Sequence, residues 1–354
     1  MMMTLKCGNT PHTARGEMPV APSHCNASLA IAKRSACPSS RWQDAIAPLL
    51  VMALPPATNL TFVNVGANKG YNVAEFLMRY HREEGGTLRN PEAWHQVLMQ
   101  TGTKKVRVRY GCGLCNACRA HPPRARLHVP VNVHAIEMVK LNARALDHLF
   151  ATFRVPGRVH HLAMSNYSGV ATYRAAAAVG LEHYELGKLG SFRTESVECS
   201  TLDDFVTRHL GAGSVGSAGR FRSGSNAAAT VPPRIDLLSI DVEGQDALVL
   251  EGARNMLDAR AVGVLEFEFI GRGFWRSGHS DQRRLSDVLG ALERRGYRCF
   301  WQGEDGQLAP ASGPYWCDSF QFRLRSNLVC SHLAQVLRVF DGLSDSVSRK
   351  RVSL

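Results

Sequence analysis

The sequence contains no apolar run long enough to cross a membrane. A membrane-spanning helix needs about 20 consecutive apolar residues, and the apolar run at residues 45–54 is much shorter and contains Pro48. Cysteine is also too sparse, at 10 of 354 residues, for a scaffold held together mainly by disulfides. We therefore expect no membrane span, and the compartment stays open with a slight preference for the cytoplasm.

A second absence concerns the turn between an expected strand at residues 60–65 and an expected helix at 71–80. This turn holds Gly66 and Gly70 in a G-x-x-x-G spacing. It has neither the G-x-G-x-x-G of dinucleotide sites nor the G-K-[ST] of P-loops. The turn lies beyond the carboxyl end of a strand, where ligands of open parallel sheets bind. Because both phosphate-binding patterns are missing, the turn favours a nucleoside without a phosphate. A purely structural turn is the alternative.

Strand-like and helix-like segments alternate after residue 40, which predicts an α/β fold with a mostly parallel sheet and right-handed crossovers. Strands are expected at residues 60–65, 131–136, 158–163, 235–240 and 262–269. Helices are expected at residues 71–80, 139–150, 245–256 and 281–295. Two further strands, at 297–301 and 319–324, are joined by a loop too short for a helix and predict an antiparallel pair at one end of the sheet.

The composition divides the chain into a core domain and less regular segments. We expect a disordered leader at residues 1–40, a core domain at 41–325, and a C-terminal helix and tail at 326–354. Two segments interrupt the core. One is a cysteine-rich basic insertion at 83–128, and the other is a loop at 211–233 that is rich in glycine, serine and alanine and is expected to be flexible.

Acidic residues follow two of the expected parallel strands. Glu137 comes directly after the strand at 131–136, and Asp241 and Glu243 follow the strand at 235–240. A carboxylate such as Glu137 can accept both hydroxyls of a ribose. Acids at these positions also cap the next helix or favour its N-terminus. Because the carboxyl ends of parallel strands meet at one edge of a sheet, we expect all three carboxylates at the ligand edge.

Two more glutamates lie within the strand expected at residues 262–269. Strand alternation places Glu266 and Glu268 on one face and the neighbouring apolar residues on the other. That face is either part of the ligand cleft or simply exposed to solvent.

Several motifs occur in the same order as in a known family. Residues 64–70 read NVGANKG, 135–137 AIE, 163–169 AMSNYSG, 201–204 TLDD, 235–244 IDLLSIDVEG and 250–252 LEG. Together they resemble the FkbM-type family of S-adenosylmethionine-dependent methyltransferases. The sequence departs from the family pattern at Asn64, where the family usually has an acid, and at Ser239, where it often has a lysine.

The resemblance implies a Rossmann-like fold with a seven-stranded, mostly parallel sheet whose last strand is antiparallel. It also implies S-adenosyl-L-methionine as the cofactor and O-methylation of a small-molecule or glycan acceptor, such as a sugar or a secondary metabolite. Carried over residue by residue, the cofactor-binding residues are Asn64, Gly66, Asn68 and Gly70 for the methionine part, Glu137 for the ribose, and Ser165 and Asn166 for the adenine.

Methyl transfer to a hydroxyl requires an in-line arrangement of donor and acceptor and removal of the proton of the acceptor. Asp241 is the first candidate for accepting this proton, and Glu243 is the second. Glu266 is a candidate for orienting the acceptor.

The insertion contains a candidate metal site. Cys112, Cys115, Cys118 and His121 supply four soft ligands, which suffice for one tetrahedral structural zinc. A disulfide, or reduced thiols in a flexible loop, would explain the same cluster.

The insertion also suggests a different function. Residues 101–127 contain several lysines and arginines and no acid, which is compatible with an RNA methyltransferase or another nucleic-acid-binding protein. A solvated basic loop is the simpler explanation. A catalytically inactive fold that binds other proteins is a further alternative, and the sequence does not indicate the oligomeric state.

Overall fold

The computed structural model describes most of the chain in twelve segments. They are residues 22–34, 41–54, 58–81, 91–101, 107–108, 127–176, 178–180, 193–211, 232–270, 275, 283–321 and 325–350.

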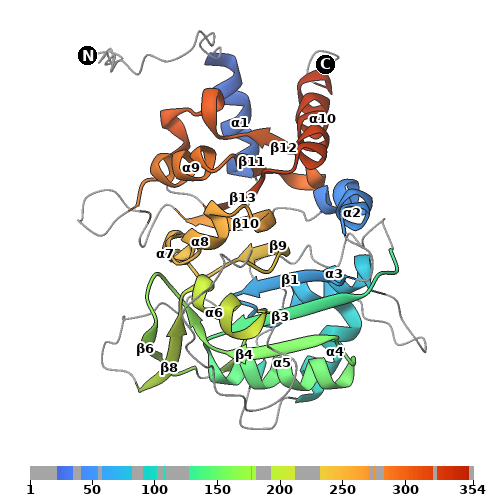
Figure 1. The fold of residues 1–354 in the computed structure, drawn as a ribbon, viewed down its shortest axis with the longest axis vertical. Coiled ribbons are helices and arrows are strands. Elements are labelled where there is room, and N and C mark those ends of the chain that lie inside the picture. Colours follow the sequence, from blue (N-terminus) through green and yellow to red (C-terminus); the bar gives the residue numbers. More distant parts are fainter. Residues whose placement is uncertain are drawn as a thin grey trace, which may run out of the picture.

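An eight-stranded mixed sheet forms the centre of the structure (Figure 1). Its strands, in spatial order, are β12 Leu308–Pro310, β11 Arg298–Gln302, β13 Arg325–Ser331, β10 Val262–Ile270, β9 Ile235–Ile240, β1 Leu60–Val65, β3 Val131–Glu137 and β4 Gly157–His161. Neighbouring strands from β10 to β4 are parallel. The strand order reverses between β1 and β9, so the carboxyl ends of these two strands mark the place where ligands of open α/β sheets bind.

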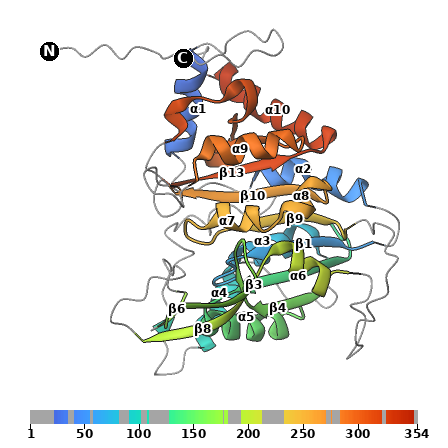
Figure 2. The same cartoon turned by 60° about the vertical axis from the view of Figure 1, so that its left-hand side comes forward.

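Helices cover both faces of this sheet (Figures 1 and 2). The apolar residues of one face pack against α6 Leu202–His209, α7 Asp246–Glu251, α8 Arg254–Asp258 and α9 Leu285–Arg294. Those of the other face pack against α2 Trp42–Met52, α3 Tyr71–Tyr80, α4 Pro91–Thr101, α5 Lys140–Thr152 and α10 Ala334–Lys350. Burial of β9 along its whole length explains why its sequence is almost uniformly apolar.

Two small sheets lie outside the central one. The first pairs β5 Ala163–Met164, β8 Thr194–Ser200 and β6 Gly169–Arg174. The second joins β2 Arg107–Val108, in the insertion, to β7 Ala178–Val179. The insertion is therefore connected to the segment that follows β6.

The α/β class and the antiparallel end of the sheet are confirmed, but the number and position of the terminal strands differ from the prediction. The sheet has eight strands rather than seven, because β12 adds to the edge beside β11. The strand expected at 319–324 was misplaced. Asp318–Phe320 is a 3-10 turn, and the strand is β13, which pairs with β10 and β11. The C-terminal helix therefore begins at Ala334 and not at residue 326.

One expected helix is divided in the structure. The helix expected at 245–256 is two short helices, α7 and α8, separated at Gly252. A Cβ on residue 252 would lie 2.1 Å from the carbonyl oxygen of Ser165, so close packing of the two segments requires glycine there.

Part of the expected disordered leader is ordered. Pro22–Arg34 forms helix α1, which packs near β11 and β12 and is linked to the domain by a disulfide between Cys25 and Cys317. A second disulfide joins Cys299 on β11 to Cys330 on β13. The sequence alone gave no indication of either pairing.

Candidate functional site

The glycine turn lies at the point where the strand order reverses. Gly66 and Gly70 have positive φ angles of 78° and 76°, and Asn68 between them has 46°. A Cβ on residue 66 would lie 1.8 Å from the carbonyl oxygen of Asp241. Glycine is therefore required at position 66 both by its conformation and by the approach of the β1 and β9 ends.

Most backbone N–H groups of this turn donate hydrogen bonds to other groups of the protein. Gly66 and Ala67 both donate to the carbonyl oxygen of Ile136, at 2.9 and 3.0 Å, and Gly70 donates to Ala67 at 2.7 Å. Asn68 donates to the carboxylate of Glu137. A phosphate site needs several free N–H groups that point at the anion, so this turn does not have the donor set of such a site.

Glu137 fastens the turn to the end of β3. Its two carboxylate oxygens accept backbone N–H groups, one from Asn68 and one from Val139, each at 2.7 Å. Its side chain is buried, and this burial raises its pKa to about 7 although the hydrogen bonds oppose the shift. The carboxylate thus has a structural role, and only its remaining lone pairs are left for ribose hydroxyls.

Residues from the insertion and from the segment after β6 pack beside the turn. A Cβ on residue 70 would come within 2.8 Å of the Trp94 ring of α4, and the Trp94 indole donates to the carbonyl of Lys69 at 2.7 Å. The Lys69 ammonium is buried and donates to the carbonyl of Gly180. Asn142 accepts the N–H of Gly180 at 2.8 Å. Glycine is therefore required at position 70 because side chains of the protein occupy the space that a Cβ would need.

Asn64 lies two residues before Gly66 and is 1% exposed. It is flanked in the sheet by Ala135 and Ser239. Neither amide atom of Asn64 has a hydrogen-bond partner among the described residues. A buried polar group without a partner is costly, so these two atoms are available to a ligand or a water molecule.

The carboxyl ends of β9 and β10 bring several charged groups together. Asp241 is exposed, and its N–H donates to Val65 at the end of β1. Glu243 is bonded to Arg325 at 3.0 Å, and Glu268 is bonded to the same guanidinium at 2.9 Å.

Two buried carboxyl groups complete this cluster. Asp246 is fully buried and accepts the backbone N–H of Glu268 at 3.2 Å. Burial, followed by the charge of Asp241, raises the pKa of Asp246 and of Glu268 well above the ordinary values. Asp246, Glu268 and Arg325 were not among the predicted site residues.

The structure does not place Glu266 in this cluster. Its side chain accepts a hydrogen bond of 2.8 Å from Gln302 of β11. The residue keeps some exposed surface, but desolvation of its carboxyl group raises the pKa to about 7. Glu266 pairs with Ser239 of β9 in the sheet register and lies before the carboxyl end of β10.

Ser165 and Asn166 lie in the loop after β5. The N–H of Ser165 donates to Ser200 of β8 at 3.1 Å, and the Asn166 amide donates to Glu251 of α7 at 2.9 Å. Ser165 is buried, whereas Asn166 is exposed. These hydrogen bonds therefore connect the loop to β8 and to α7, the helix that follows Asp241 in the chain.

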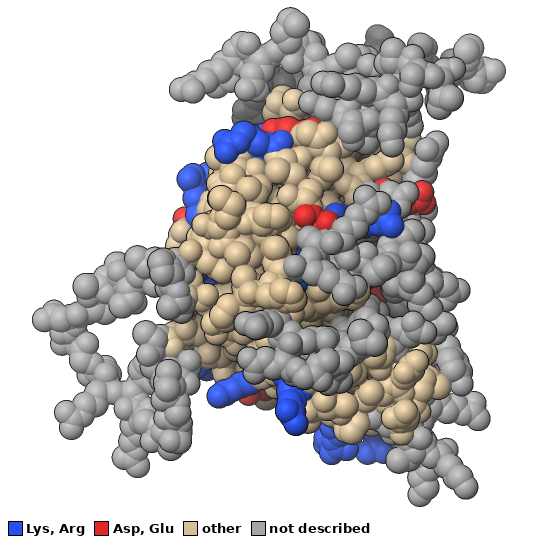
Figure 3. Space-filling view, turned by 90° about the vertical axis from the view of Figure 1, so that its right-hand side faces the viewer, with Lys and Arg blue, Asp and Glu red and all other residues tan. Residues whose placement is uncertain are grey.

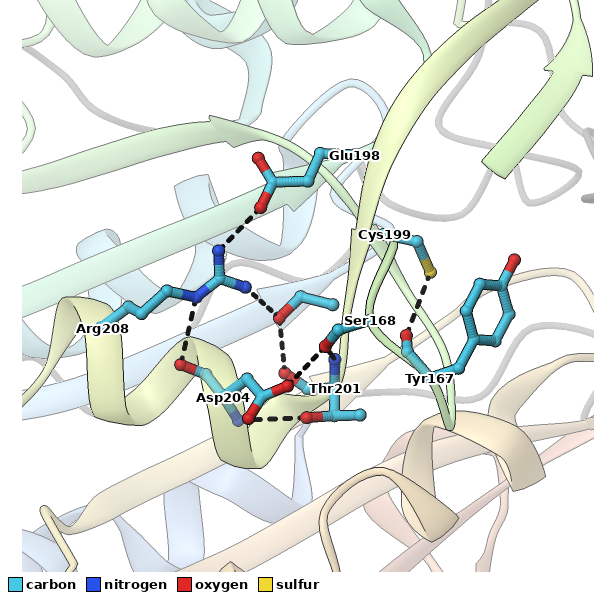
Figure 4. Close-up of polar contacts among 8 residues, drawn as sticks. Tyr167, Ser168, Glu198, Cys199, Thr201, Asp204 and Arg208 are labelled. Carbon is cyan, nitrogen blue, oxygen red and sulfur yellow. Dashed lines mark hydrogen bonds and ion pairs between the residues drawn. The ribbon is translucent and has the colours of Figure 1, made fainter. Parts of the chain in front are cut away.

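The TLDD motif fixes this loop to α6 (Figure 4). Thr201 caps α6 by accepting the N–H of Asp204 at 3.1 Å, and the Ser168 hydroxyl bonds the Asp204 carboxylate. Asp203 accepts the N–H groups of two residues at the start of α8, at 2.9 and 3.0 Å. The motif has a structural role in these contacts.

The predicted zinc ligands Cys112, Cys115, Cys118 and His121 lie outside the described residues, so zinc stays a prediction. Within the described segments, no group of three or more histidine, cysteine or acidic side chains is arranged to hold a metal ion. Most of the basic residues of the insertion also lie outside them. On the face shown in Figure 3, the described lysines and arginines form separate small groups and no continuous basic surface.

Among the helices that the structure describes, none combines the length and the apolar character that crossing a membrane requires.

The mixed sheet and the glycine turn at its order reversal define an α/β protein with a candidate ligand site at the carboxyl ends of β1 and β9. Residues 227–299 match a family model described as the methyltransferase FkbM domain. This match confirms the resemblance to the FkbM-type family and supports a methyltransferase function for the chain. The matched segment includes Asp241, Glu243 and Glu266, whereas Gly66 and Glu137 precede it. No curated protein and no solved structure matches the chain.

Proposed function

We propose that the protein is an S-adenosyl-L-methionine-dependent methyltransferase that methylates a hydroxyl group of a small molecule or glycan. The observation that carries this proposal is the fastening of the Gly66–Gly70 turn by Glu137 where the strand order reverses. The FkbM domain match at residues 227–299 supports the reaction class.

The charges around the turn fit this cofactor better than a phosphorylated one. Asp241 and Glu243 follow β9 and Glu137 ends β3, and carboxylates attract a cation such as a sulfonium or an amino group. A phosphate would meet these carboxylates with few free N–H donors to compensate. The site therefore favours a positively charged nucleoside.

The proposed positions of the cofactor parts follow from the geometry around the turn. Asn64, Gly66, Asn68 and Gly70 would lie along the methionine part. The amide of Asn64 has no partner among the described residues, so its nitrogen can donate and its oxygen can accept there. Glu137 would hold the ribose through its remaining lone pairs. Ser165 and Asn166 would border the adenine.

S-adenosyl-L-methionine supplies an electrophilic methyl group when it is bound. The chain must hold the acceptor oxygen in line with that group and take up the proton of the hydroxyl. Asp241 is the proposed proton acceptor because the residue is exposed and its backbone carbonyl lies against Gly66 of the turn. Glu243 is bonded to Arg325, which makes it the second choice. Glu266 has the weakest support, since its carboxyl group contacts Gln302.

The test is methyl transfer from labelled donor to a panel of sugars, glycans and hydroxylated metabolites. We expect Asp241→Ala to abolish turnover while donor binding stays measurable. Undiminished turnover in this variant would remove Asp241 from the site. Labelling of RNA with salt-sensitive binding, rather than of small molecules, would point to the nucleic-acid alternative. Donor binding by calorimetry separates an enzyme from an inactive fold, which should release no heat.

A further inference from the structure

Arg325 bridges two carboxylates at the edge of the ligand site. Its Nε lies 2.9 Å from Glu268, and a terminal guanidinium nitrogen lies 3.0 Å from Glu243. Arg325 is the first residue of β13 and lies beyond the segment that matches the FkbM domain. It is partly buried, at 24% exposure, so solvent screens these two ion pairs only in part.

The ion pair with Arg325 supports Glu243, whose backbone conformation is unfavourable. Its φ of 57° lies in the left-handed region, which is unfavourable for a residue with a Cβ. Glu243 lies two residues after Asp241, and Gly244 follows with a φ of 95°. The ion pair to Arg325 therefore helps to hold the turn that carries Asp241.

Glu268 needs the same cation for a different reason. It is 4% exposed, and its second oxygen has no hydrogen-bond partner within the described part of the chain. Asp241 and Asp246 lie near enough to raise its pKa further, and Arg325 opposes this shift. With the guanidinium removed, four acidic side chains, those of Asp241, Glu243, Asp246 and Glu268, would lie near one another at the strand ends without this cation.

We propose that Arg325 is a positioning residue of the methyltransferase site. It acts through Glu243 and Glu268 to fix the Asp241–Gly244 turn and to set the charge of the carboxyl cluster. This inference rests on the proposed function, because it assigns Arg325 to the site in which Asp241 accepts the proton.

The first experiment compares Arg325→Met with Arg298→Met. Arg298 is a matched control, since it also lies in the sheet and bonds both oxygens of one carboxylate, that of Asp341. We expect Arg325→Met to lower kcat by about tenfold or more, with a smaller change in the donor Kd. The acidic limb of the pH–kcat/KM profile should move to higher pH, because the carboxyl groups lose their cation. The control should change neither. A kcat within twofold of wild type with an unchanged pH profile would overturn the proposal.

A double variant separates positioning from simple stability. Arg325→Met with Glu268→Gln removes the buried charge that needs a partner, so the Tm should recover while kcat stays low. Recovery of both would mean that Arg325 only compensates Glu268, and it would overturn the positioning role.

A third readout does not depend on activity. Hydrogen exchange of the backbone amides at residues 241–246 should become faster in Arg325→Met than in Arg298→Met. If wild type fails to bind the donor, the proposed function fails, whereas unchanged exchange at these amides shows that Arg325 does not position the turn. The two failures are therefore distinguishable.

The two disulfides carry a second, independent inference. Cys25 and Cys317 join residues 292 positions apart, with Cα atoms at 5.8 Å. Cys299 and Cys330 link neighbouring strands, with Cα atoms at 4.1 Å. Among the described residues, Cys199 is the one cysteine left free. Cytosolic reductants usually keep such thiols reduced.

We infer that the chain folds in an oxidising compartment, contrary to the slight preference for the cytoplasm drawn from the sequence. The test is the full chain produced both in a reducing cytosol and behind a secretory signal. Peptide mapping without reductant should find Cys25 joined to Cys317 and Cys299 joined to Cys330 in the secreted protein, and dithiothreitol should lower its Tm by about 5 °C or more. Complete alkylation of these four cysteines in the secreted protein, or an equal Tm with reductant, would overturn the inference.

Discussion

The backbone N–H of Asn68 donates to the carboxylate of Glu137 over 2.7 Å. These residues belong to different strand ends, because Asn68 follows β1 and Glu137 ends β3. The contact fixes the glycine turn against the neighbouring strand and satisfies a buried carboxylate at the same time. The candidate ligand site therefore contains a hydrogen bond that holds its turn in place without a ligand.

The first prediction concerns this contact. In Glu137→Gln, the new amide nitrogen must face one of two N–H donors, from Asn68 or Val139. One donor then loses its acceptor in a buried place, which should cost about 1–3 kcal/mol of unfolding free energy. Urea unfolding measures this loss. Glu198→Gln is the control, because Glu198 forms an exposed pair with Arg208 and should change stability by less than about 1 kcal/mol.

The second prediction concerns Gly66. An alanine there would place its Cβ 1.8 Å from the Asp241 carbonyl oxygen in a backbone with φ of 78°. Gly66→Ala should therefore destabilise the fold by about 2 kcal/mol or more and weaken donor binding. Gly342→Ala in α10 is the matched substitution, since a Cβ at that position meets nothing within 4 Å, and it should be neutral or slightly stabilising. Equal thermal stability of the two variants would contradict the close approach of β1 and β9.

The third prediction concerns pH and Glu266. Its pKa is about 7 in the folded protein against an ordinary 4.5, so the native state binds the proton more tightly than the unfolded state. Stability should then fall as pH rises between these values, by up to about 1.4 kcal/mol per pH unit for one proton. Glu266→Gln should flatten this part of the stability–pH curve and stabilise the protein most at pH 8. Denaturant unfolding from pH 5 to 8 checks the slope, and a wild-type slope in the variant would show that Glu266 titrates normally.

The fourth prediction has the opposite sign and concerns His134 and His160. Their rings are 3.0 Å apart at the nearest nitrogens, and burial lowers their pKa values to about 4 and about 3. The unfolded chain binds protons more readily, so stability is full above pH 6.5 and falls as the pH drops toward the folded values. His160→Phe, which keeps an aromatic ring beside Phe205, should reduce this acid sensitivity. An unchanged stability profile between pH 4 and 6.5 would rule out His160 as its source.

Local sequence patterns predicted the part of the fold that depends on neighbouring residues. The strand–turn–helix around Gly66 and the mostly apolar β9 follow directly from composition and spacing, and so does the acid at the end of β3. The placement of Glu137 and Asp241 near one turn followed from the rule that parallel strands share a carboxyl edge.

The remaining features depend on contacts between distant residues. Gly252 lies between α7 and α8, where the Ser165 carbonyl leaves no room for a Cβ, and α1 is held by a disulfide to Cys317. Arg325 had no local signal, since its partners are 57 and 82 positions earlier in the chain and its strand had been placed at 319–324. Glu268 did have a signal, because alternation put it on the same face as Glu266, one step nearer the strand end.

Isothermal titration of the protein with S-adenosyl-L-methionine shows whether the Gly66–Gly70 turn belongs to a cofactor site. We expect saturable binding of one donor molecule per chain, with a clearly weaker Kd in Glu137→Gln and an unchanged Kd in Glu198→Gln. Absence of binding heat at millimolar donor, with the protein shown to be folded, would contradict the assignment of the Gly66–Gly70 turn as a cofactor site.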